Sequence, residues 1–75
     1  MTTTDARETH ALAYLRPALT EAMSRGRAVS AEWIPTSLSS GELASLAARL
    51  CSHAEANCAV LANPVRMGVT FTPLR

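Results

Sequence analysis

The sequence contains no lysine and no glutamine, and only three aromatic residues in 75 positions. All seven basic residues are arginines, which are scattered along the chain and offset by six acids to a net charge of +1. Domains that bind nucleic acid concentrate basic residues on one face, and this composition gives no such electrostatic footprint. It also contains no polybasic run of the kind that binds a membrane surface. The charge pattern therefore argues against functions that depend on a strong positive field.

Long apolar runs are absent as well. Residues 1–5 have neither the positive region nor the apolar region of a signal peptide. No apolar run is longer than Ala11 to Leu15, whereas a helix needs about 20 apolar residues to span a bilayer. We expect a cytoplasmic protein that does not contact a membrane.

The chain is also poor in residues that carry chemistry. Cys51 and Cys58 are too few for a disulfide framework, and on one continuous helix they lie about 10 Å apart, beyond disulfide reach. Buried free thiols are the expected state. The only imidazoles are His10 and His53, and helix geometry turns Cys51 and His53 to different sides. No nucleotide-binding or nucleophile motif is present. We predict no metal, no cofactor and no enzymatic activity.

Large apolar side chains are few, because alanine supplies 14 of the 36 residues behind the 48% apolar content. A domain of this size buries only about 60% of the surface of its unfolded chain. We expect one small domain over residues 1–75, with flexible ends at 1–4 and 73–75. Self-association offers such a domain a simple route to stability, so we expect a homodimer or a higher oligomer.

A first helix is predicted from Asp5 to Arg25. Thr4 or Asp5 can cap its start, and Arg25 followed by Gly26 is typical of a helix end. Pro17 removes one backbone hydrogen bond, so we expect a kinked helix, with two shorter helices as the alternative. The apolar stripe of this helix consists of Leu12, Leu15, Leu19 and Met23.

A strand is predicted over residues 27–34. Val29, Ala31 and Trp33 alternate with polar residues there, and Pro35 cannot continue the ladder. The predicted final strand, residues 65–72, alternates strictly and ends before Pro73. Its inward face is predicted to consist of Val65, Met67, Val69 and Phe71.

The clearest local signal lies between the two strands. Ser39 and Glu42 have the spacing of a capping box, and Leu38 can pack on Leu43 across the first turn. A second helix is therefore predicted to begin at Ser39. Its apolar stripe stays in phase as far as Leu61, which favours a helix to Ala62.

An alternative for the second half of this segment stays open. The helix can instead stop near Asn57, which tolerates a left-handed conformation, and leave residues 58–62 to form a strand before Asn63-Pro64. Residues 42–61 also have a faint helix-turn-helix look, although the recognition helix would carry an acid and neither Arg nor Lys.

The predicted fold class is α+β, in the order helix, strand, helix, strand. Two long amphipathic helices would pack on a small sheet whose edges need covering, which oligomerisation would supply through a sheet edge or through the second helix. This order of elements, with a basic glycine turn after the first helix, resembles small head-to-tail connector proteins of tailed phages. The resemblance carries no functional residue over to this chain.

These observations favour a non-catalytic protein–protein interaction module. Lys-free, Ala- and Arg-rich usage is typical of GC-rich genomes, so we expect a bacterial or phage accessory or inhibitor protein that docks on a larger protein. The candidate partner-binding residues are Arg25, Arg27, Trp33 and Arg66, the arginines forming a cationic rim if the strands are neighbours. The core is the favoured location for Trp33, with an exposed patch as its alternative. The second hypothesis for function is a small nucleic-acid-binding transcriptional regulator that acts as a dimer.

Overall fold

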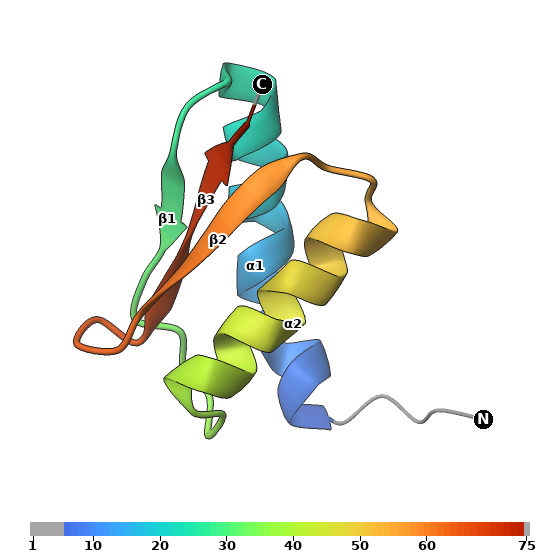
Figure 1. Ribbon diagram of the computed structural model, residues 1–75. Helices are drawn as coiled ribbons and strands as arrows, with labels where there is room; N and C mark the ends of the chain where they lie inside the picture. Colours follow the sequence, from blue (N-terminus) through green and yellow to red (C-terminus); the bar gives the residue numbers. More distant parts are fainter. Residues whose placement is uncertain (1–5, 75) are drawn as a thin grey trace.

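The computed structural model describes residues 6–74, which form two helices and a three-stranded antiparallel sheet (Figure 1). The order helix, strand, helix, strand, strand confirms the α+β class and adds one strand to the prediction. β3 lies in the centre of the sheet, between β1 and β2. The expected caps Thr4 and Asp5 lie outside the described residues. The elements are α1 (Ala6–Arg25), β1 (Val29–Ala31), α2 (Ser40–His53), β2 (Cys58–Asn63) and β3 (Gly68–Pro73).

α1 continues through Pro17 as one helix, so the alternative of two helices is wrong. Pro17 and Ala13, whose carbonyl loses its helical partner, are both exposed, so water can satisfy that carbonyl. Gly26 ends the helix in a left-handed conformation, φ 66°, and its N–H donates to the Ala22 carbonyl over 2.8 Å. The predicted glycine terminus is confirmed.

α2 begins as predicted. The Ser39 hydroxyl accepts from the Glu42 N–H at 3.2 Å, and the Glu42 carboxylate accepts from the Ser39 N–H at 2.9 Å. Leu38 and Leu43 are both buried on the two sides of this turn, where the predicted hydrophobic contact places them. The capping box is complete.

The end of α2 corrects the prediction of a helix to Ala62. Ala54 is the C-cap and Glu55 follows in a left-handed conformation, φ 54°. The Glu55 N–H donates to the Ser52 carbonyl and the Ala56 N–H to the Cys51 carbonyl, which is the Schellman motif. Residues 58–63 then form β2, so the strand alternative is right and the helix-turn-helix look is misleading. Glutamate stands where this motif usually has glycine, which hid the helix end.

β1 is shorter than the predicted strand over residues 27–34. Trp33 adopts a left-handed conformation, φ 60°, which ends the regular ladder and turns its side chain outward. Trp33 is 68% exposed, and Ile34 is buried in its place. The favoured core location of Trp33 is therefore wrong. Residues 33 and 34 still lie beside the β2–β3 turn, because their N–H groups donate to the carbonyls of Arg66 and Met67 at 2.8 and 3.0 Å.

β2 and β3 form a hairpin, which shortens the predicted final strand at its start. Residues 64–67 form the turn, with Arg66 N–H donating to the Asn63 carbonyl at 3.2 Å. Val65, predicted to face inward, is 88% exposed. Val69 and Phe71 are fully buried, as the alternation predicts.

The core lies between the helices and one face of the sheet. Phe71 pairs with Val29 on one side and Val60 on the other, and these side chains pack under both helices. The helices contribute leucine and alanine, which lets them approach the sheet closely. None of the helices among residues 6–74 is long and apolar enough to cross a membrane. The largest helical contributors to the core are Leu15, Leu19, Leu43, Leu46 and Leu50.

Candidate functional site

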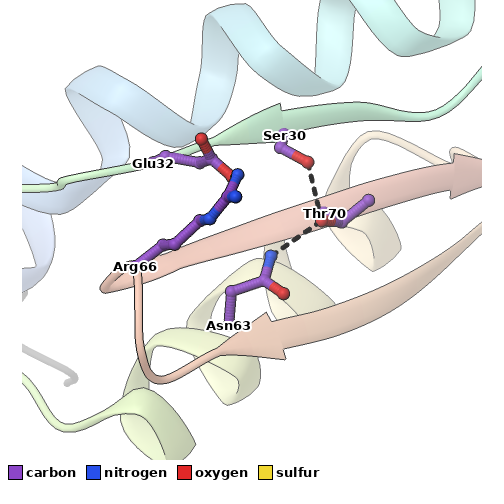
Figure 2. Close-up of polar contacts among 5 residues, drawn as sticks. All are labelled: Ser30, Glu32, Asn63, Arg66 and Thr70. Atoms are coloured by element: carbon purple, nitrogen blue, oxygen red, sulfur yellow. Dashed lines mark hydrogen bonds and ion pairs between the residues drawn. The ribbon is translucent and has the colours of Figure 1, made fainter.

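The face of the sheet turned away from the helices, here called the open face, carries a row of small polar side chains. Ser30 of β1, Thr70 of β3 and Asn63 of β2 point toward one another across the three strands (Figure 2). The Thr70 hydroxyl lies 2.7 Å from the Ser30 hydroxyl and accepts from the Asn63 amide at 2.8 Å. This polar row cross-links the three strands on the open face.

Where the chain leaves β1 and lies beside the β2–β3 turn, an aromatic residue, an ion pair and an exposed aliphatic residue occur on neighbouring segments. We name this region the Trp33 corner and define it as Glu32, Trp33, Val65 and Arg66. Arg66 extends across from the hairpin turn to Glu32, and its guanidinium lies 2.9 Å from the carboxylate (Figure 2). Trp33 and Val65 are among the most exposed large apolar side chains of the described residues. The Trp33 N–H donates to the Arg66 carbonyl, so the two residues are neighbours, and Trp and Arg are the residue types that most often dominate binding energy at protein interfaces.

The backbone holds the Trp33 corner in a strained conformation. Trp33 and Met67 both have positive φ, 60° and 46°, and they lie on the two facing segments. A bulky residue in the left-handed region costs about 1–2 kcal/mol, and such strain concentrates at functional sites. Gly68 permits the close approach of these segments, since a Cβ there would lie 2.8 Å from Glu32 Cα and closer still to the Ala31 carbonyl oxygen.

The predicted cluster of three arginines does not form. Arg25 and Arg27 lie before β1, whereas Arg66 lies beside the residues that follow β1, so the length of the strand separates them. Arg25 is paired with Glu21 one helical turn away, at 3.4 Å. Of the four predicted partner-binding residues, the structure brings together only Trp33 and Arg66.

The two cysteines lie on neighbouring elements instead of one helix. Cys51 is buried in α2 and Cys58 begins β2, and both are free thiols. The Cys58 thiol donates to the Met23 sulfur at 3.1 Å. Burial raises the pKa of the Cys51 thiol, and the charge and hydrogen bond of Cys58 raise it further. Cys51 is therefore protonated at neutral pH, which suits neither a nucleophile nor a metal ligand.

The two histidines lie in separate shallow depressions. The His10 ring contacts the Tyr14 ring in a tilted arrangement, with centroids 5.7 Å apart and planes at 58°, and His10 borders a hollow of about 270 Å³ beside Pro35. His53 borders a groove of about 200 Å³ between α1 and α2, where Arg49 pairs with Glu8 at 2.8 Å. Neither depression includes a cysteine. Within residues 6–74 no group of three His, Cys, Asp or Glu side chains is placed to hold a metal ion.

The exposure of Leu61 and Val65 is not what the sequence predicts. The favoured helix to Ala62 puts Leu61, which is 65% exposed, in an apolar stripe, and the predicted final strand puts Val65 on its inward face. A usable signal was present: Asn63-Pro64 and Gly68 bracket a short turn between two apolar runs, which is typical of a hairpin. Once residues 58–73 are assigned to a hairpin, the alternation of side chains places Asn63 and Thr70 on the same face of the sheet.

Comparison with known proteins gives no relative. No protein-family model matches the sequence, and no curated protein and no solved structure is detectably similar to it.

Proposed function

We propose that this protein is a non-catalytic interaction module that docks on a larger protein through the Trp33 corner. The observation that supports this most is the exposure of Trp33, 68%, in a strained left-handed conformation beside the Arg66–Glu32 ion pair. The fold gains little from this arrangement, because most of the ring stays in water. A binding partner that buries the ring would gain the burial energy of one of the largest apolar side chains.

The polar row supports the same proposal. Its hydroxyl groups and the Asn63 amide N–H already bond to one another, so a partner that covers them has fewer polar groups left to satisfy. The surface around Trp33 then resembles an interface rim of satisfied polar groups beside an aromatic anchor. We propose that the module is a bacterial or phage accessory or inhibitor protein that acts in the cytoplasm. We also propose that it forms a homodimer or a higher oligomer.

The alternative function, a nucleic-acid-binding regulator, stays a prediction with less support. Arg25, Arg49 and Arg66 each pair with a glutamate, which offsets the positive charge that phosphate contacts require. The arginines are also distributed over α1, α2 and the hairpin turn. A protein surface is the partner that suits this distribution best.

Affinity capture with matched variants tests the docking proposal. Immobilised wild-type protein, Trp33→Ser and Tyr14→Ser are compared on lysate of the source cells, with bound proteins quantified by mass spectrometry. Tyr14 is the control because it is also an exposed aromatic residue, on α1. We expect a protein that binds the wild type and Tyr14→Ser but is reduced at least tenfold on Trp33→Ser. Equal capture by all three proteins would refute docking through Trp33.

A further inference from the structure

We propose that β2 is the self-association surface, and that its occupant is β2 of a second copy, paired antiparallel about a two-fold axis at Leu61. This inference rests on the proposed self-association and assigns it to one surface and one register. The two sheets would join into a continuous six-stranded sheet, in the order β1-β3-β2-β2-β3-β1. The two Trp33 corners would then lie at its far ends.

The two edges of the sheet differ in how they are protected against pairing. Natural edge strands are usually short or carry charges and proline, which prevent uncontrolled association. β1 has three residues and is followed by Glu32 and, shortly after, Pro35. β2 has six residues, Cys-Ala-Val-Leu-Ala-Asn, with no charge and no proline. Of the two sheet edges formed by residues 6–74, β2 alone is long and unprotected enough to template another strand.

The hydrogen-bond pattern between β2 and β3 shows which backbone N–H and C=O groups of β2 point to its free edge. The Leu74 N–H donates to the Asn57 carbonyl at 2.7 Å, which fixes the phase of the ladder with β3. Alternate residues of an antiparallel strand bond to opposite sides, so Leu61 bonds toward β3 while Val60 and Ala62 direct their N–H and C=O groups to the free edge. No hydrogen bond from the described residues reaches these outward groups.

The free edge is complementary to a second copy of itself. In the register centred on Leu61, Val60 of one copy faces Ala62 of the other, and each such pair exchanges two backbone hydrogen bonds. Leu61 then faces Leu61 of the second copy as a non-hydrogen-bonded pair, with Cα atoms about 4.5 Å apart. This covers a leucine that is 65% exposed in the single chain. With no charge on the strand, the two-fold axis brings no like charges together.

The helices leave room for this pairing. α2 packs over β2, and its side toward α1 carries Leu46, Arg49 and His53, which line the groove between the helices. The opposite side carries Ala44 and Ala48, neither of them large. Two copies of α2 can therefore approach to about 8 Å, the short end of helix packing distances. A stable interface needs about 600 Å² from each copy, roughly an eighth of the 4827 Å² surface. β2 and this side of α2 are the elements that would supply it in the proposed dimer.

Light scattering and cross-linking test the proposal on the full chain. Wild type is expected to be a dimer, and Leu61→Lys, which places two positive charges at the axis, is expected to weaken dimerisation at least tenfold. Tyr14→Lys is the matched control, because it adds the same charge at an exposed apolar residue on α1, outside β2 and outside the Trp33 corner. Leu61→Cys is expected to form a disulfide-linked dimer under mild oxidation, since its Cα spacing suits a disulfide. Thr72→Cys lies on the same face but in β3, about 20 Å from its mate in this register, and should not cross-link above wild type.

The outcomes separate this inference from the proposal on which it rests. A strictly monomeric wild type at high micromolar concentration overturns both self-association and this interface. A dimeric wild type overturns the β2 interface alone if Leu61→Lys stays dimeric or if Leu61→Cys fails to cross-link. Docking through Trp33 is measured independently by the capture experiment.

Discussion

Gly68 is the residue through which the close approach of β1 and β3 can be tested. An alanine Cβ at this position would lie 2.8 Å from Glu32 Cα and 3.0 Å from the Ala31 carbonyl carbon, and closest to the Ala31 carbonyl oxygen. These are backbone atoms and cannot rotate away. Because carbon atoms in contact prefer about 3.5–4.0 Å, β1 must move outward by about 1 Å. That movement stretches the β1–β3 ladder and its junction with the Trp33 corner.

The expected destabilisation of Gly68→Ala is about 2–3 kcal/mol, the upper part of the range for overpacking a closely packed site. The assay is urea unfolding followed by far-UV circular dichroism. A domain of this size has an m-value near 1 kcal/mol/M, so the midpoint should fall by about 2–3 M. If wild type dimerises, all variants are compared at one protein concentration, because the midpoint then depends on it.

Gly41→Ala is the matched control for Gly68→Ala. Gly41 lies in the first turn of α2, where a Cβ meets only the Ser39 hydroxyl at 3.9 Å. Alanine there should stabilise the helix by about 0.5 kcal/mol, the opposite sign. If Gly68→Ala unfolds at the wild-type midpoint or above it, β1 does not pack on β3 as described, and the arrangement of Trp33 beside Arg66 loses its physical basis.

Three further predictions concern backbone strain and titration. Trp33→Gly should be about 1 kcal/mol more stable than Trp33→Ala in urea unfolding, reversing the usual order, because only glycine relieves the positive φ. Glu55→Gly should raise the free energy of unfolding by about 1 kcal/mol, and an unchanged value would mean that no strain exists at this helix end. The raised pKa of Cys51 makes the folded state retain its proton, so its stabilising contribution is present below the ordinary thiol pKa of 9.0 and is lost as pH rises through the folded value. The pH dependence of unfolding between pH 8 and 10.5 should therefore be steeper in wild type than in Cys51→Ala.

The sequence predicted elements where side-chain signals are local. The capping box at Ser39 and Glu42 and the terminal glycine of α1 lie within a few residues of the groups they satisfy, so each could be recognised without knowing the fold. The alternation of Val69 and Phe71 likewise needs only neighbouring residues. These features fixed the fold class.

The errors arose where tertiary contacts override local preference. Glu55 and Trp33 both adopt conformations that their residue types disfavour, so neither the end of α2 nor the end of β1 had a local signal. The position of Leu61 matches the helical spacing of the apolar residues of α2 only by coincidence, because Leu61 lies on β2 and is exposed. The candidate site was only half predictable for the same reason: Trp33 and Arg66 could be chosen by residue type, but their pairing depends on the hairpin, which separates them from Arg25 and Arg27.

The central position of β3 has a consequence for how the chain folds as it is synthesised. β1 and β2 each pair only with β3, which follows both of them in the sequence. Val29 pairs with Phe71, which lies over forty residues later in the sequence, so the β1–β3 ladder cannot form until Phe71 has been synthesised. Until β3 leaves the ribosome, the helices have no sheet to cover and β2 has both edges free. A chain interrupted before Gly68 would therefore be expected to lose the whole sheet, not one strand of it.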